Sequence, residues 1–497
     1  MKDSTTERIE LERLKETPKT SHFAGFLAPD INPSFEKNPE SLIIIAMQPT
    51  DLLAAILKFD EFLPSPIREV FYIVLLVILF VIQIIIARST WIFYRQEAFK
   101  KDIPWILMEI KIPREINKSP RAMEQVLASI HALRNFAGDL REIYWDGEVT
   151  RWYSFEMVSY GGEVHFYIRF YWKQRALVEA AFFSYYPDVE LIEVEDYVAQ
   201  FPTSIEDMYQ QGYELWGTEM TLSRSPGYPI KTYPEFLDSA EEEKQFDPMS
   251  SFLEVLSKVK KEEIVGIQIL AAPKGNEWRK EYEPFLEKLQ ETKVSSTTTP
   301  SDKIAGELKL FTRSIMRSPG ETDILKAVEN NLSKPAFDTL IRFIYLSPKS
   351  LFYDSFARRG LTGAFNQYSA LDLNSFKQNY SMGTRVRFWN WPHIFPSLRN
   401  EYRKQRLLYI YRNRKLPLKT FMAKLITSKF FHPNFSSHTY PLNTEALATL
   451  FHPPMKIILT APHIQRIESR RAGPPAGLAI YGDENSIDKF TKEPGKK

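Results

Sequence analysis

The stretch that decides how this chain is organised is VFYIVLLVILFVIQIIIA, residues 70–87. Its eighteen residues carry no charge and one strongly polar side chain, Gln83. At about 1.5 Å of rise per residue, a helix of this length spans roughly 27 Å, close to the ~30 Å hydrocarbon core of a bilayer. A helix also satisfies its backbone hydrogen bonds internally, as a lipid environment demands. The pattern predicts a transmembrane helix over residues 70–94, whose end carries interfacial aromatic residues.

Positive charge is concentrated after this stretch. Only Lys58 and Arg68 lie close on its N-terminal side, whereas the C-terminal flank holds Arg88, Arg95, Lys100 and Lys101. Because positive flanks stay inside, the long C-terminal part is expected in the cytoplasm. The sequence thus predicts a single-pass protein of the cell (inner, cytoplasmic) membrane, with the lipid bilayer as a partner.

The two ends of the chain have a different composition. Residues 1–46 mix charge, Pro, Ser and Thr with few large apolar residues and are predicted to be disordered. Residues 47–66 are apolar but interrupted by charge, which favours an interfacial amphipathic helix over a second span. Residues 461–497 are predicted to be an extended linker and a disordered tail.

The central part has the composition of folded protein, and its pattern predicts an α+β class. Of the 497 residues, 44% are hydrophobic and 14% aromatic, which argues against a wholly disordered chain. The absence of cysteine excludes disulfides, thiolate metal ligands and a cysteine nucleophile. The net charge of +2 says little until its distribution is considered.

Residues 104–198 show strand and helix patterns in the order β-α-β-β-α-β. The expected strands are 106–112, 152–159, 164–170 and 189–194, with a hairpin turn at Gly161-Gly162. The first helix opens at Ser119-Pro120 and carries an apolar stripe, and the second covers about residues 173–185. This order is that of a ferredoxin-like domain.

Residues 203–370 repeat the theme less clearly and are predicted to be a second α+β domain, a diverged relative of the first. Strands are expected at 214–223, 264–271 and 337–346, and helices at 249–259 and 350–358, the latter ended by Gly360. Residues 371–460 are predicted to be a basic, aromatic-rich helical region. It has a helix between Pro396 and Lys429 and another at 442–450, capped by Asn443 or Thr444.

The strongest functional signal is a basic run. Between Arg385 and Lys429 there are twelve Lys or Arg residues and one acid, Glu401. Interleaved aromatic rings could stack on bases while the cations neutralise phosphates, as in single-strand binders. The same composition suits anionic lipid headgroups, an acidic partner surface or a solvated structural face. The candidate contact residues are Arg403, Lys404, Arg406, Tyr409, Tyr411, Arg412, Arg414 and Lys415.

Motifs for catalysis are missing from the sequence. No window matches the phosphate-binding G-x-x-x-x-G-K-[ST] loop, and no G-x-S-x-G elbow occurs. The eight histidines are scattered without an H-x-x-x-H pair, and Glu190, Glu193, Glu195 and Asp196 are expected on a solvated strand edge. We therefore predict no catalytic residue, no cofactor site and no metal site, and a protein that is not an enzyme.

Several long segments resemble a known family. They are residues 105–135, 154–170, 185–197, 442–454 and 461–478. They are similar to the membrane-anchored N-terminal region, a domain of unknown function, of bacterial type IV secretion and conjugation-type ATPases. In the longer relatives this region precedes a HerA/FtsK-like motor domain, which is not expected in this chain. The resemblance implies non-catalytic α+β domains that position a motor at the membrane, and a homo-oligomer by analogy with ring-shaped motors.

Two hypotheses follow from the sequence. In the first, the chain is a non-catalytic accessory or scaffold protein of a type IV secretion-like or conjugative DNA-transfer system. It would position a separately encoded P-loop motor ATPase at the cytoplasmic membrane face. In the alternative, it is a membrane-tethered protein that binds nucleic acid, such as DNA, through residues 385–429.

Overall fold

The computed structural model divides the chain into two units, residues 1–84 and 85–497. The residues it describes are 65–113, 118–237, 246–275, 277–290, 319–387, 389, 393, 395–417, 420–426, 436–455 and 466–467. The predicted disordered segment 1–46, almost all of the interfacial helix 47–66, and the tail 461–497 apart from 466–467 lie outside them.

Helix α3 (Ser65–Lys101) contains the predicted span and continues past the boundary between the units. Its large apolar side chains between Val70 and Ile86 are exposed, Leu76 by 67%. In the described part of the chain, one helix is long and apolar enough to cross a membrane, and it is this one, over Glu69–Lys101. An exposed apolar surface of this length is unfavourable in water, which agrees with the prediction from its sequence.

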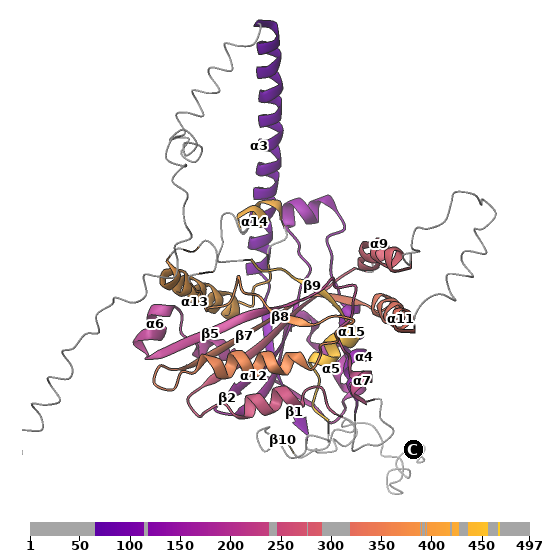
Figure 1. The fold of residues 1–497 in the computed structure, drawn as a ribbon, viewed down its shortest axis with the longest axis vertical. Coiled ribbons are helices and arrows are strands. Elements are labelled where there is room, and N and C mark those ends of the chain that lie inside the picture. Colours follow the sequence, from indigo (N-terminus) through magenta and orange to yellow (C-terminus); the bar gives the residue numbers. More distant parts are fainter. Residues whose placement is uncertain are drawn as a thin grey trace, which may run out of the picture. The chain divides into compact units, whose positions relative to one another are not determined.

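The second unit is built on a large, mainly antiparallel sheet with helices (Figure 1). Its strands are β1 (Trp105–Pro113), β2 (Tyr153–Tyr160), β3 (Glu163–Tyr171), β4 (Glu190–Glu193), β5 (Tyr213–Leu222), β6 (Ile264–Pro273), β7 (Ala336–Pro348), β8 (Phe376–Gln378), β9 (Tyr440–Asn443) and β10 (Arg466–Ile467). Its main helices are α4 (Pro120–Ala132), α5 (Arg175–Tyr185), α6 (Ile205–Gln210), α7 (Tyr233–Leu237), α8 (Ser250–Ser257), α9 (Trp278–Gln290), α11 (Pro319–Ser333), α12 (Asp354–Asn366), α13 (Pro396–Arg412), α14 (Phe421–Ile426) and α15 (Thr444–Leu450).

The strand order joins the two predicted domains into one sheet. Along the sheet the order is β10-β1-β3-β2-β6-β7-β5-β8, with β4 also beside β1 and β9 beside β7. Short β10 runs parallel to β1, and the other pairings are antiparallel. The first half pairs as β4-β1-β3-β2 and the second as β8-β5-β7-β6, so both halves use the same relative order. Pairing of β2 with β6 satisfies edges that would otherwise expose unpaired backbone groups.

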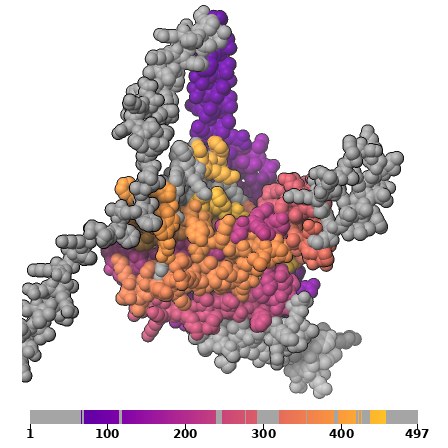
Figure 2. Space-filling view, in the orientation of Figure 1, coloured from indigo at the N-terminus to yellow at the C-terminus, as the bar shows by residue number. Residues whose placement is uncertain are grey.

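One face of the sheet carries the main hydrophobic core. The stripe predicted on α4 is buried there, with Met123, Val126, Leu127 and Ile130 each 0% exposed. The core also takes in apolar side chains of α5, α8, α12 and α15. Figure 2 shows segments of the second half, coloured rose to orange, on the side of the molecule turned to the viewer.

The opposite face of the sheet is covered by α6 and α13, whose apolar residues form a second cluster. Two glycines make room for α13. A Cβ at Gly217 would lie 2.5 Å from Leu407 Cδ2, and one at Gly266 would overlap the Tyr411 hydroxyl. Both glycines pair with Ile344 on the central strand β7. The helix therefore lies against the backbone of the sheet.

Most predicted local elements are confirmed, and two helix ends are corrected. The Gly161-Gly162 turn has φ values of 57° and 95°, and the Asn443 side chain caps α15 by accepting the N–H of Ala446 at 2.7 Å. The prediction that Gly360 ends a helix is wrong, because α12 runs through it to Asn366 and the glycine makes room beside Val255. The region predicted to be helical between Pro396 and Lys429 contains two helices in its described part, because α13 ends at Arg412, Arg414 turns the chain with a φ of 48°, and α14 follows.

Candidate functional site

The basic run folds into α13 and the turn after it, and the structure separates its predicted contact residues into two groups. Arg403, Lys404, Tyr411 and Arg414 are buried, with exposed fractions between 0% and 7%. Arg406, Arg412 and Lys415 are partly exposed, and Tyr409 is 48% exposed. The charges that are close in sequence therefore do not form one surface.

Arg414 is the centre of a buried ion-pair cluster. Its Nε donates to Glu156 Oε1 at 2.6 Å and its Nη2 to Glu156 Oε2 at 3.0 Å. The same guanidinium donates to both carboxylate oxygens of Asp196, at 2.6 and 2.9 Å. Burial alone would lower the pKa of Arg414, but its interactions with Glu156, Tyr197 and Asp196 together outweigh this effect and hold the pKa well above its usual value.

A second buried pair lies next to the first. Arg342 donates to Glu219 Oε1 through Nη2 at 2.8 Å and Nε at 3.1 Å. It also donates to the carbonyls of Ile410 and Lys415, each at 3.1 Å. The register places Glu156, Gln268, Arg342 and Glu219 opposite one another on β2, β6, β7 and β5. This row of buried polar side chains binds the C-terminal end of α13 to the middle of the sheet.

Other cations of α13 also have partners within the chain. Arg403 donates to the carbonyls of Tyr380 and Gly383 at 2.7 and 3.0 Å. Lys404 contacts the carboxylates of Glu214 at 2.8 Å and Glu401 at 3.1 Å. Arg412 donates to the carbonyl of Pro202 at 3.1 Å.

These contacts change the interpretation of the basic run. In this conformation the side chains of Arg403, Lys404, Tyr411 and Arg414 are buried and bonded to other groups of the chain. The residues that the sequence analysis missed are the acids Glu156, Glu214 and Glu219, together with Asp196, which it had assigned to a solvated edge. Nothing in the local sequence marks them as counter-ions of α13, since they come from distant strands and loops.

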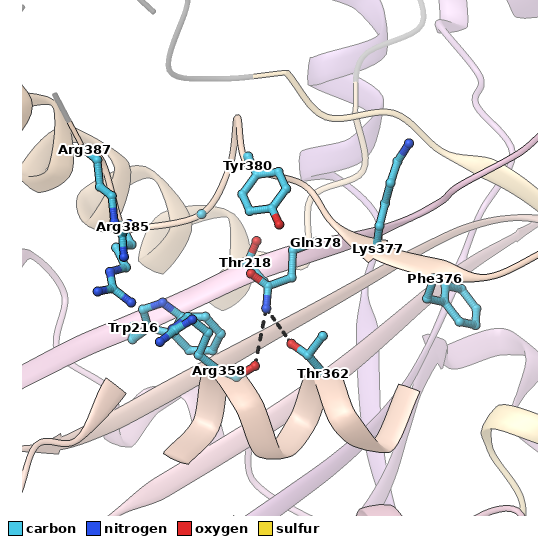
Figure 3. A pocket seen from close by; sticks show the side chains of 11 residues that line it. Trp216, Thr218, Arg358, Thr362, Phe376, Lys377, Gln378, Tyr380, Arg385 and Arg387 are labelled. Atoms are coloured by element: carbon cyan, nitrogen blue, oxygen red, sulfur yellow. Dashed lines mark hydrogen bonds between the residues drawn. The ribbon is translucent and has the colours of Figure 1, made fainter. Parts of the chain in front are cut away.

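A basic cavity of about 440 Å³ lies beside the edge strand β8 (Figure 3). Its cationic lining residues are Arg358 of α12, Lys377 of β8, and Arg385 and Arg387, the first two cations of the basic run. Trp216 and Tyr380 supply aromatic rings, and no carboxylate belongs to its described lining. Gln378 donates to the carbonyl of Arg358 at 3.3 Å and to Thr362 Oγ1 at 2.5 Å, which orders the base of the cavity (Figure 3).

The part of α3 in the second unit is bound to the segment around residues 142–147. Trp91 Nε1 donates to the Tyr144 carbonyl at 2.6 Å, and Arg95 Nε donates to the Trp145 carbonyl. Gly147 has a φ of 67°, and a Cβ there would overlap the backbone of Arg95. The C-terminal end of this helix is thus packed closely against the domain that follows it.

Together these features define an α+β protein with one candidate membrane-spanning helix in its described part. Buried ion pairs hold helix α13 and the turn after it on its sheet. The family described as Domain of unknown function (DUF8128) matches residues 94–383, more than half of the chain, and the chain belongs to this family. The match starts within α3 and ends just before the basic helix α13. No curated protein matches the chain.

Proposed function

We propose that this protein is a membrane-anchored, non-catalytic scaffold that holds a separately encoded P-loop motor ATPase at the cytoplasmic face of a bacterial cell membrane. The setting would be a type IV secretion-like or conjugative DNA-transfer system, as the resemblance of its segments implies. In this proposal residues 70–94 are a single span, the second unit is cytoplasmic, and each half of its sheet is a ferredoxin-like module.

The observation that carries the proposal is the close packing of the end of α3. A flexible tether would need no side-chain contacts with the domain, whereas Trp91 and Arg95 both donate to backbone carbonyls of residues 144–145. Gly147 is the residue type that this approach requires, because any side chain would meet the helix backbone. Such contacts fix the C-terminal end of α3 on the domain that follows it, which is what a positioning device needs.

The first test measures this coupling directly. The chain has no cysteine, so Tyr94→Cys and Trp172→Cys introduce two unique spin-label sites at exposed positions of the second unit. We expect a narrow label-to-label distance distribution, which Gly147→Ala broadens. Gly138→Ala is the matched control, since the nearest atom to a Cβ there is 3.8 Å away. A broad distribution in the unsubstituted background would contradict the positioning role.

The second test asks for the partner. Photoreactive residues replace Tyr353, Trp389 and Leu398, which are each more than 60% exposed. Crosslinking in cells, followed by detergent extraction, should recover a P-loop ATPase. Intact, membrane-inserted protein that yields no such ATPase from any of these sites would reject the scaffold function.

The alternative, a membrane-tethered nucleic-acid-binding protein, is favoured by one observation, the basic and aromatic cavity beside β8. The Lys377→Glu variant should bind a single-stranded oligonucleotide more weakly than the wild type. The slope of log affinity against log salt concentration should fall in magnitude by roughly one. Lys258→Glu, at the residue that follows α8, is the control, since the Lys258 side chain is 63% exposed. Equal affinities of the two variants and the wild type would eliminate this alternative.

A further inference from the structure

A second cavity, of about 430 Å³, lies within the second unit between the end of α3, the strands β1, β3 and β7, and helix α13. Trp105, Trp152 and Arg169 of the sheet region form part of its lining, together with Phe93 and Lys101 of α3. Its volume is in the range of ordinary small-ligand sites. We propose that this cavity binds a phosphate group, with the Arg169 guanidinium as its principal ligand.

The lining is strongly cationic. Glu97 is the one carboxylate among the described lining residues, and it already bonds Lys100 at 2.9 Å and lies 3.8 Å from Lys415. The cationic lining residues are Lys100, Lys101, Arg169, Arg342, Arg406 and Lys415. Even with Arg342 neutralised by Glu219, a positive excess remains, which favours an anionic ligand.

Arg169 is partly buried and differs from the two buried arginines of this face, Arg342 and Arg414. Arg342 and Arg414 each have a buried carboxylate, but no described residue accepts a hydrogen bond from the Arg169 guanidinium. Its contact is the ring of Trp105, 4.4 Å from the guanidinium carbon. Burial, with the nearby charge of Arg414, lowers the pKa of Arg169 to about 10. The fold thus holds a partly buried cation near the charges of Glu156 and Asp196 but without a direct hydrogen bond to any described carboxylate, and a phosphate offers two oxygens to its planar fork.

Ser437 gives an independent indication of a ligand. It lines the same cavity, is 8% exposed, and its Oγ has no hydrogen-bond partner among the described residues. A buried hydroxyl without a partner is costly, and a bound oxyanion would accept its hydrogen bond. The tilted pair of Trp105 and Trp152, 4.8 Å between centroids, adds an apolar surface beside these polar groups.

The phosphate has two possible sources, a phospholipid headgroup and a free phosphate. Along α3, Phe93 lies six residues after Ala87, the end of the apolar run 70–87, about 9 Å of helix and within the interfacial aromatic end of the predicted span, which favours the headgroup. The assignment of a lipid headgroup as the ligand rests on the membrane anchoring in the proposed function, whereas the assignment of a phosphate site does not. Its tests also do not involve a motor ATPase, so the two proposals fail separately.

The test uses the full chain and follows its thermal unfolding. In a detergent without phosphate, inorganic phosphate replaces chloride at constant ionic strength. In a second arm, nanodiscs of phosphatidylcholine with and without phosphatidylglycerol are compared. We expect phosphate to raise the unfolding temperature, Arg169→Gln to weaken its binding roughly tenfold or more, and phosphatidylglycerol to stabilise the wild type but not this variant. Arg175→Gln, an exposed arginine on α5, is the control and should behave as the wild type.

Ser437→Ala guards against a folding artefact. Removing an unpartnered hydroxyl should leave the unliganded protein at least as stable, while phosphate affinity falls severalfold. Stabilisation by phosphate but not by phosphatidylglycerol would support the phosphate site and refute a phospholipid headgroup as its ligand. The proposal is overturned if neither source stabilises the wild type, or if Arg169→Gln binds phosphate as tightly as the wild type does.

Discussion

Replacing Arg414 by methionine should destabilise the protein severely. The substitution removes two hydrogen bonds to Glu156, a residue that is 0% exposed. The Glu156 carboxylate then keeps hydrogen bonds from Ser154 and Gln268. Breaking a buried ion pair on one side costs about 3–5 kcal/mol, because the remaining charge is neither paired nor hydrated. Asp196, whose side chain is 40% exposed, can be rehydrated and adds little. We therefore expect the free energy of unfolding to fall by about 3–5 kcal/mol.

Urea unfolding in detergent, followed by tryptophan fluorescence, measures this loss. Lys415→Met is the matched control, because the Lys415 side chain is 42% exposed and should contribute under about 1 kcal/mol. Combining Arg414→Met with Glu156→Gln should restore part of the stability, since no unpaired charge remains. If Arg414→Met unfolds within about 1 kcal/mol of the wild type and instead loses affinity for DNA or anionic lipid, Arg414 is a surface cation and the buried cluster is refuted.

Three further predictions follow from other contacts. Gly266→Ala should lower the free energy of unfolding by about 1–3 kcal/mol, because the added methyl group pushes α13 from the sheet. The double variant Gly266→Ala/Tyr411→Phe should lose less stability. Equal stability of Gly266→Ala and the wild type would contradict the close packing. Lys334→Met should lower the free energy of unfolding by about 3 kcal/mol, because Lys334 is the cation between the buried Glu124 and Glu445. Adding Glu445→Gln to this variant should restore part of the stability measured by urea unfolding. Burial lowers the pKa of His131, so the unfolded chain binds its proton more readily; stability should fall as pH drops below about 6.5, with a shallower fall in His131→Gln.

The sequence by itself determined the features that depend on neighbouring residues. The apolar run 70–87 has the length and composition of a span whatever the rest of the chain does. The stripe of α4, the glycine turn between β2 and β3 and the Asn443 cap were predictable for the same reason, since periodicity, positive φ and capping act over a few residues. Gly360 was misjudged because a glycine serves equally well as a helix end or as a point of close packing.

Only the tertiary structure decided how the charges and strands combine. The pairing of β2 with β6 merges the two halves into one sheet, and no local pattern specifies which edge meets which. The basic run looked like an open binding surface because its counter-ions are remote: Glu156 lies 258 residues from Arg414, and Glu219 lies 123 residues from Arg342. Electrostatic pairing depends on distance in space. Arg414 and Arg342, which pair with buried carboxylates, can therefore be distinguished from Arg169, which contacts the Trp105 ring, only after folding.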